Sequence, residues 1–277
     1  MIKMLYFGYG SNLDKEDWLN WCGQRDGSKL TEITRCYAKG YIMRFNYYSN
    51  NRGCGAANLV HTGKETHGTP GVLFEIDDYT LSLLDKKEGY PTSYQRIKIN
   101  VITEENEVCE AITYTSNLYT SDDFYAPSEE YYSLIENGLK SRGMNYNHLI
   151  KAAKNEQPGM VDSLFVYGTL KSGESRNPLL GSGRVIAAKT KGILLDLEYY
   201  PGMINGNGEV FGELRFISEI KCTIEELDRV EGADLNEPLF TREIIGVIHG
   251  NNQVNWALCY LYNRSSGDER TIQSGVW

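Results

Sequence analysis

The chain has 277 residues, 41% of them hydrophobic, and a formal net charge of −9 at pH 7. This acidic balance argues against a nucleic-acid partner, because proteins that follow phosphates use clustered Lys and Arg. No early stretch has signal-peptide character, and no later one has the roughly 20 apolar residues of a membrane span. We therefore expect a cytoplasmic protein with no membrane partner, which acts on small molecules and is long enough for two domains.

Four sequence blocks occur twice in the same order. A short apolar strand runs into a Tyr-Gly-hydroxyl loop, a glycine-led strand follows, then a helix that ends in Glu-Gly, and a strand of alternating polarity closes the unit. The paired blocks are 5–11 and 163–169, 71–76 and 212–217, 84–89 and 227–232, and 94–99 and 240–245. Such widely spaced copies indicate a domain duplication, since solenoid repeats have periods of about 20 to 50 residues.

The boundary between the copies is predicted within residues 155–160. This segment is polar and contains Pro158 and Gly159, which interrupt helices, just before the second apolar strand. The sequence therefore predicts two modules, residues 1–156 and 161–277. Each module is expected to be α+β, because short apolar runs predict strands and an amphipathic helix precedes each shared glutamate.

The helix before the first shared glutamate has recognisable ends. Asp78 is the expected N-cap, Leu81 and Leu84 form its apolar stripe, and Gly89 is the expected stop. The same layout is repeated by Ser218, Ile220, Ile224, Leu227 and Gly232.

The Tyr-Gly loops are the first candidate binding elements. Glycine after a strand lets the backbone approach a ligand with its amides exposed, and such amides can bind a carboxylate or an oxyanion. A simple tight turn is the alternative, but recurrence upstream of the same glutamate block favours a binding role. The candidate residues are Tyr9, Gly10, Ser11, Asn12 and Leu13 in the first copy and Tyr167, Gly168, Thr169 and Leu170 in the second.

Other chemistries fit these loops poorly. A dinucleotide loop would need a third glycine where Leu13 stands, and Ser11 lacks the flanking glycines and the recurring histidine of a serine hydrolase. The six cysteines lie far apart, without paired metal-ligand spacing, and are expected to be buried reduced thiols. We predict no metal and no cofactor.

Glu88 and Glu231 are the candidate catalytic residues. Each stands at the expected end of a helix, where the field of exposed carbonyls disfavours a carboxylate by roughly 0.3 to 1 kcal/mol. This field, together with any burial, should raise the carboxyl pKa toward the working pH, as a general acid/base requires. The alternative is an exposed glutamate on a fraying helix end, which recurrence beside the Tyr-Gly loop makes less favourable.

These residues resemble the γ-glutamylcyclotransferase superfamily. Residues 1–156 resemble a full-length γ-glutamylcyclotransferase through the Tyr9 to Leu13 loop, 71–74, 84–89 and 125–128. Residues 163–277 resemble the shorter γ-glutamylamine cyclotransferases through 165–171, 227–232 and 274–277. The ordered set is more specific than any single motif. It implies a small mixed barrel of about six strands in each module, flanked by helices, with loop and glutamate meeting in one cavity.

The resemblance also implies a reaction. In this superfamily the α-amino group of a γ-glutamyl amide attacks its own γ-carbonyl and releases 5-oxoproline and an amine. The family name calls the enzyme a transferase, although the reaction is of the lyase type. Carried over, Glu88 and Glu231 exchange the protons, and the amides of 10–13 and 168–170 hold the substrate. Tyr114 and Tyr131 match tyrosines near the substrate, although core packing explains them equally well.

Several alternatives remain open at this point. The second module has Phe240 where the first has Tyr94, so its substrate is expected to differ. Arg96 and Arg242 could bind a substrate carboxylate or form structural ion pairs. Only one module could be active, or the chain could be a non-catalytic binder of acidic small molecules that keeps the cavity. The leaving amine and the oligomeric state are not predicted.

Overall fold

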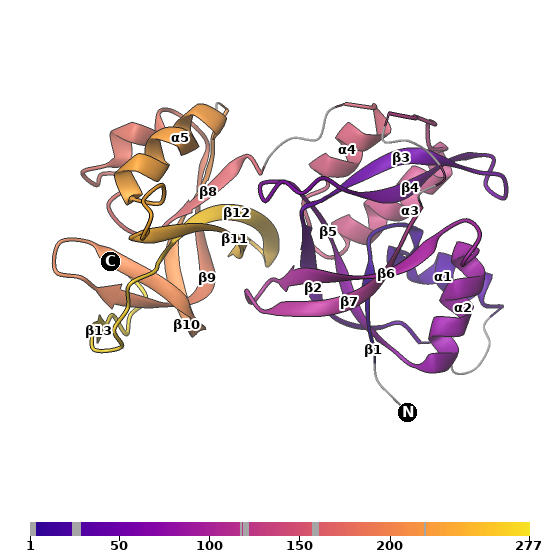
Figure 1. Cartoon of the computed structure of the whole chain (residues 1–277), viewed down its shortest axis with the longest axis horizontal. Coiled ribbons are helices and arrows are strands. Elements are labelled where there is room, and N and C mark those ends of the chain that lie inside the picture. The colour runs from indigo at the N-terminus through magenta and orange to yellow at the C-terminus, as the bar shows by residue number, and fades with distance from the viewer. Residues whose placement is uncertain (1–3, 24–28, 117, 119–121, 157–160, 219) are drawn as a thin grey trace. The chain divides into compact units, whose positions relative to one another are not determined.

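The computed structural model describes residues 4–23, 29–116, 118, 122–156, 161–218 and 220–277. It divides into two compact units, one formed by residues 1–103 and 107–159 and the other by 104–106 and 160–277. The boundary predicted within 155–160 lies partly outside the described residues, because 157–160 are among those not described. The two units are considered separately below (Figure 1).

The first unit is a closed barrel of five strands with an additional hairpin. Its strands are β1 (Met4–Gly8), β2 (Thr31–Lys39), β3 (Tyr41–Ser49), β4 (Cys54–His61), β5 (Gly68–Ile76), β6 (Gln95–Thr103) and β7 (Val108–Thr115). Its helices are η1 (Ser11–Leu13, a 3-10 turn), α1 (Lys15–Trp21), α2 (Asp78–Glu88), α3 (Glu129–Lys140) and α4 (Asn147–Ala153). The barrel order is β1-β5-β2-β6-β7, and β3 pairs with β4 in a separate sheet.

The second unit repeats this barrel. Its strands are β8 (Ser163–Val166), β9 (Val185–Asp196), β10 (Pro201–Phe216), β11 (Phe240–His249), β12 (Gln253–Tyr262) and β13 (Arg270–Thr271), and its helices are η2 (Asn177–Leu180) and α5 (Ile220–Glu231). The ring runs β8-β10-β9-β11-β12, which matches the first barrel strand for strand. In both, the ring closes through a parallel contact, β1 with β7 and β8 with β12. The predicted α+β class with two small mixed barrels is confirmed, with five strands in each ring instead of about six.

One repeated glycine explains why the two barrels share a register. β1 runs antiparallel to β5 with Gly8 opposite Val72, and β8 runs antiparallel to β10 with Val166 opposite Glu213. A Cβ on Gly71 would lie 2.4 Å from the Gly8 carbonyl oxygen, and one on Gly212 would lie 2.2 Å from the Val166 carbonyl oxygen. Both distances are far inside van der Waals contact, so only glycine lets the first strand approach its neighbour this closely.

The glutamate-bearing helix α2 begins one residue earlier than expected. Asp77 and not Asp78 is the N-cap, since its side chain accepts a hydrogen bond from the Thr80 amide at 2.7 Å. Leu83 and Leu84 are fully buried, whereas Leu81, expected in the apolar stripe, is only partly buried. The helix ends as predicted, on a glycine with a left-handed φ of 65° at Gly89.

Helix α5 ends in the same way, at Gly232 with a φ of 64°. Its buried apolar residues are Ile220, Ile224 and Leu227, as the pattern predicts. In both units the glutamate is therefore the last residue of a helix, and a glycine turns the chain away directly after it.

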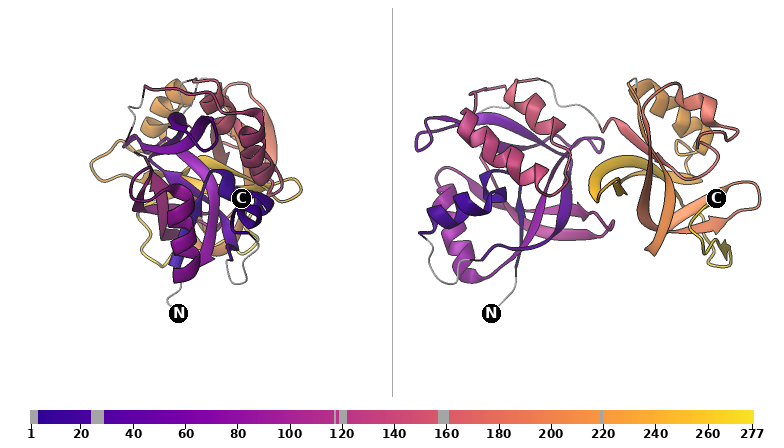
Figure 2. Two further views of the ribbon diagram at one scale, coloured as in Figure 1. Left: turned by 90° about the vertical axis from the view of Figure 1, so that its right-hand side faces the viewer. Right: turned by 180° about the vertical axis from the view of Figure 1, so that it is seen from behind.

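Helices α1 and α3 position the first Tyr-Gly loop. Gly138 of α3 faces the loop so closely that a Cβ there would lie 2.5 Å from the Leu13 Cβ. On α1, the Asp17 carboxylate accepts a 2.7 Å ion-pair contact from Lys87 of α2, which joins the two helices beside the loop. Figure 2 shows these helices from two further directions. None of the helices within the described ranges is both long and apolar enough to cross a membrane.

Candidate functional site

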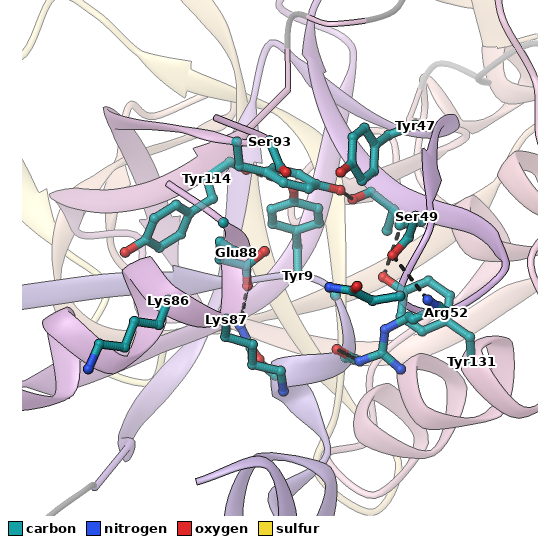
Figure 3. A pocket seen from close by; sticks show the side chains of 18 of the residues that line it. Tyr9, Tyr47, Ser49, Arg52, Lys86, Lys87, Glu88, Ser93, Tyr114 and Tyr131 are labelled. Carbon is teal, nitrogen blue, oxygen red and sulfur yellow. Dashed lines mark hydrogen bonds between the residues drawn. The ribbon is translucent and has the colours of Figure 1, made fainter. Parts of the chain in front are cut away.

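The first unit contains a cavity of about 130 Å³ at the junction of the Tyr-Gly loop, the β3–β4 hairpin and the end of α2. Figure 3 shows the Glu88 side chain within it, with Tyr114 on one side and Arg52 and Tyr131 on the other. The lining residues are Tyr6, Tyr9, Gly10, Ser11, Asn12, Tyr47, Ser49, Asn51, Arg52, Ala56, Ala57, Lys86, Lys87, Glu88, Gly89, Ser93, Tyr94, Tyr114 and Tyr131. Leu13, which was a candidate binding residue, is absent from this lining and is buried against α3.

The loop and the glutamate meet through Asn12. Its Nδ2 donates to Glu88 Oε1 at 2.8 Å and to the Tyr6 hydroxyl at 2.8 Å. Asn12 is only 5% exposed, so its amide cannot exchange these partners for bulk water. The carboxylate is therefore held at a fixed position against the loop, where a group bound in the cavity can reach it.

The electrostatic environment of Glu88 suits proton transfer. Burial raises the pKa of Glu88, and the nearby charge of Lys87, the Asn12 hydrogen bond and the charge of Arg52 act in the opposite direction. The net direction is upward, toward the pH range in which a carboxyl group can both accept and return a proton.

Both Tyr-Gly loops are tight turns whose tyrosine hydroxyls are already engaged. Tyr9 donates to the Tyr114 carbonyl at 2.7 Å, and Tyr167 donates to the Tyr260 carbonyl at 2.7 Å. Within the first loop the Leu13 amide donates to the Gly10 carbonyl at 3.0 Å, so this amide, one of those expected to hold substrate, is used inside the turn. The equivalent turn in the second unit closes with the Lys171 amide on the Gly168 carbonyl at 2.9 Å.

A hydrogen-bonded triad fastens each glutamate-bearing helix to its barrel. Asp85, one turn before Glu88, accepts from the Tyr114 hydroxyl at 2.7 Å and pairs with Arg96 at 3.2 Å. In the second unit Asp228 accepts from the Tyr260 hydroxyl at 2.7 Å and pairs with Arg242. Both arginines are thus in ion pairs with helix aspartates, which is the structural alternative left open by the sequence.

The β3–β4 hairpin contributes site residues that the repeated blocks did not identify. Arg52, at the turn of the hairpin, donates to the Ser11 hydroxyl at 3.1 Å and lies over the Tyr131 ring at 4.6 Å. The Tyr131 hydroxyl accepts from the Ala57 amide at 3.2 Å. The hydroxyl of Tyr94 donates to the Ala57 carbonyl at 2.8 Å. The hairpin and α3 together therefore wall the cavity.

The second unit has a smaller cavity, about 40 Å³, in the equivalent place. It is lined by Phe165, Val166, Tyr167, Gly168, Thr169, Leu170, Arg176, Tyr200, Pro201, Glu231, Phe240 and Tyr260. Pro201 packs directly on the loop, since a Cβ on Gly168 would lie 2.6 Å from its Cγ, whereas a Cβ on Gly10 would meet only the Tyr131 hydroxyl at 3.7 Å. The space beside the loop is therefore partly filled in the second unit and open in the first.

Glu231 is more enclosed than Glu88 and has a different partner. It is 7% exposed, and its Oε1 accepts from Arg176 Nη1 at 3.2 Å. Burial raises the pKa of Glu231, and both the charge and the hydrogen bond of Arg176 oppose that rise. Each predicted glutamate thus lies beside its own Tyr-Gly loop, but the donor that holds it differs.

In the described part of the chain, potential metal ligands do not gather in groups of three, and the thiols differ in exposure. No group of three or more His, Cys, Asp or Glu side chains there could hold a metal ion. The six cysteines are reduced thiols, and Cys22, Cys36, Cys54 and Cys259 are buried. The expectation that all six are buried is wrong for Cys109, which is partly exposed, and for Cys222, which is exposed.

Comparison with known proteins gives consistent matches. A family model described as "Gamma-glutamyl cyclotransferase, AIG2-like" matches residues 6–134 and 164–277. The Escherichia coli K12 "Gamma-glutamylcyclotransferase family protein YtfP" is 29% identical over 118 residues, covering 41% of this chain and 94% of that protein. The Niallia circulans "Gamma-L-glutamyl-butirosin B gamma-glutamyl cyclotransferase" is 34% identical over 109 residues, covering 38% of this chain and 69% of that protein.

Two solved structures illustrate the structural matches. A "Gamma-glutamyl cyclotransferase" structure aligns with 57% of this chain and 90% of its own, at 23% identity and a TM-score of 0.47. The structure of YkqA from Bacillus subtilis aligns with 95% of this chain and 85% of its own, at 16% identity and a TM-score of 0.38.

Proposed function

Because the chain belongs to the gamma-glutamyl cyclotransferase, AIG2-like family, we propose that it cleaves γ-glutamyl amides to 5-oxoproline and a free amine. The observation that carries the proposal is the Glu88 carboxyl, which is partly buried, lines a cavity and is held against the Tyr-Gly loop by Asn12 at 2.8 Å. A carboxyl in a cavity with a raised pKa is suited to moving a proton at a bound substrate.

In the proposed reaction Glu88 takes a proton from the α-ammonium of the γ-glutamyl group. The freed amine attacks the γ-carbonyl carbon, Glu88 returns its proton to the leaving nitrogen, and the C–N bond to that nitrogen breaks. The ring nitrogen gives up its second proton, to Glu88 or to water, so that the neutral lactam forms and the carboxylate is available again. Such an intramolecular nucleophile can have an effective molarity of about 10⁵ to 10⁸ M. The enzyme therefore needs to fold the substrate and to move protons from the attacking nitrogen to the leaving nitrogen, and one carboxyl group can do this.

The developing oxyanion would be stabilised by backbone amides of the Tyr-Gly loop. Gly10 and Ser11 line the cavity beside Glu88, and the space next to the Gly10 Cα is open up to the Tyr131 hydroxyl. Donors fixed in this way act without reorganising during the reaction. We assign the amides before Leu13 to this role, since that of Leu13 closes the turn.

Two specific observations distinguish the second unit and favour the first unit as the main site of turnover. Its cavity is about 40 Å³ against about 130 Å³, and the Glu231 carboxylate is already in an ion pair. We propose that the first unit is the main catalyst. Under this proposal the second unit either acts on a smaller substrate or binds an acidic small molecule without cleaving it.

The proposed activity is tested by incubating the intact chain with a panel of γ-glutamyl compounds and measuring 5-oxoproline. The panel should contain γ-glutamyl amino acids, γ-glutamyl-ε-lysine and γ-glutamyl polyamines. We expect release from at least one of them and none from the Glu88→Gln/Glu231→Gln double variant. Absence of release from every compound by a folded protein would contradict the proposal and favour a binding role.

The pH dependence of the first unit follows from the raised pKa of Glu88. In a Glu231→Gln background, kcat/KM should fall on acidification, with a midpoint above the ordinary glutamate pKa, because the base must be ionised. Asn12→Leu removes a hydrogen bond that lowers this pKa, so the acidic limb should move to higher pH.

The control for this shift is Asn100→Leu, which changes an exposed asparagine on β6 and should leave the limb in place. Rates over pH 4 to 9 check the prediction. A limb that moves to lower pH in Asn12→Leu would mean that the titrating group is not Glu88.

A further inference from the structure

Two polar groups around Glu88 have no counterpart around Glu231. The repeated blocks and the shared strand register place Leu164 where the first unit has Tyr6, and Leu170 where it has Asn12. Hydrocarbon thus replaces both the hydroxyl and the amide. A carboxylate as enclosed as Glu231 would be strongly disfavoured if nothing else donated to it.

Arg176 supplies the missing donor from a different position in the sequence. Its Nη1 lies 3.2 Å from Glu231 Oε1, and its backbone amide donates to the Thr169 carbonyl at 2.9 Å. The arginine is therefore tied to the Tyr-Gly loop by its main chain and to the helix end by its side chain. Asn12 links the loop to Glu88 in the same way in the first unit. Asn12 is itself part of the loop, whereas Arg176 follows the loop in the sequence.

We propose that Arg176 is the positioning residue of the second unit, which holds the Glu231 carboxylate against the Tyr-Gly loop with a charged donor where the first unit uses the neutral amide of Asn12. The inference rests on the proposed function only in treating Glu231 as the second unit's counterpart of Glu88. The bridge itself is defined by contacts and can be measured without turnover.

Two other titratable groups that face Glu231 carry no charge near neutral pH. Tyr167, on the loop, and Cys259, on β12, both have their pKa raised by burial. Asp228, one turn earlier on α5, is paired with Arg242. Among the described residues around Glu231, Arg176 is thus the cation that sets its protonation. A positive charge favours the ionised form, so removing it should raise the pKa of Glu231.

This arrangement holds the two glutamates by donors of different charge. Glu88 depends on a neutral hydrogen bond inside a cavity that also receives the charges of Lys87 and Arg52. Glu231 depends on one guanidinium, and an anionic ligand that drew Arg176 away would release the carboxylate and raise its proton affinity at the same time.

The test is a ¹³C NMR titration of the glutamate carboxyl groups in the full chain, with the Glu231 signal identified by its loss in Glu231→Gln. Arg176→Gln should raise the Glu231 midpoint by about one pH unit or more, the shift expected from losing an opposite charge at this distance. Arg176→Lys, which keeps the charge, should stay closer to the wild-type midpoint. Leu170→Asn in the Arg176→Gln background rebuilds the first unit's donor and should bring the midpoint part of the way back.

The control is Arg229→Gln. Arg229 lies on the same helix as Glu231, and its exposed side chain donates to the Glu225 carbonyl. It should leave the Glu231 midpoint unchanged. An unchanged midpoint in Arg176→Gln, or an equal shift in Arg229→Gln, would overturn the proposal. If Arg176→Gln does not fold, the Leu170→Asn/Arg176→Gln protein decides: a midpoint above the wild-type value supports the charged-donor role, and an identical one overturns it. The titration does not depend on turnover, so the Arg176 proposal can be tested even if no γ-glutamyl compound is cleaved.

Discussion

Glu88→Gln should lower the rate at which the first unit releases 5-oxoproline by about 10²- to 10⁴-fold, the range contributed by a positioned general acid/base. Glutamine keeps the size of the side chain, and its carbonyl oxygen can still accept the 2.8 Å hydrogen bond from Asn12. What it loses is the ability to take a proton from the substrate ammonium. Because burial already raises the pKa of Glu88, replacing it by a neutral group should not destabilise the unit.

The measurement compares the wild-type chain, the two single Gln variants and the double variant on one cleaved substrate. Glu110→Gln is the matched control, because Glu110 is an exposed carboxylate of the same unit, paired with Lys98. It should leave the rate unchanged. The two sites belong to separate units, so their losses should add as independent activities. Wild-type turnover by the double variant would remove both glutamates from the mechanism.

Gly212→Ala should destabilise the second unit by about 3 kcal/mol or more, at the upper end of what overpacking costs. The added Cβ would lie 2.2 Å from the Val166 carbonyl oxygen, a backbone atom that cannot move without opening the β8–β10 pairing. Gly71→Ala should do the same in the first unit, where the clash is with the Gly8 carbonyl oxygen at 2.4 Å. Urea unfolding followed by circular dichroism measures both changes.

The control for the glycine prediction separates steric overlap from backbone strain. Gly267 has a φ of 87° with no atom within 4 Å of an added Cβ, so Gly267→Ala tests the strain alone. It should cost about 1 to 2 kcal/mol. Equal losses from Gly212→Ala and Gly267→Ala would show that the close approach of the strands is not what selects glycine at position 212.

The repeated features of the site could be predicted because repetition itself was the signal. Glu88 and Glu231 lie beside their Tyr-Gly loops as the paired blocks indicated, each at the end of a helix closed by glycine. The helix start was predicted one residue late, because Asp77 and Asp78 are adjacent and only the side-chain geometry distinguishes the cap. The barrel was expected from the resemblance, and its strand number was set by pairings that alternation of polarity does not reveal.

Two arginines that distinguish the sites could not be predicted, because they lie outside the repeated blocks. Arg52 reaches the first cavity from the turn of a hairpin, and Arg176 reaches the second from the segment after the loop. Long-range contacts of this kind depend on how the chain folds back, and a lone arginine in a polar segment carries no pattern of its own.

The glutamate-bearing helix is attached to its barrel in the same way in both units. Asp85 contacts Tyr114 and Arg96 in the first, and Asp228 contacts Tyr260 and Arg242 in the second. The two glutamates of one sample can therefore be compared under identical conditions. A change in temperature, ionic strength or denaturant that weakens this type of attachment should shift the pKa of both glutamates in the same direction. A change that affects the neutral donor Asn12 and the charged donor Arg176 differently should shift the pKa of only one of the two glutamates. Equal shifts of the two pKa values would thus report on the contacts that the two units share, and unequal shifts would report on the donors that differ between them.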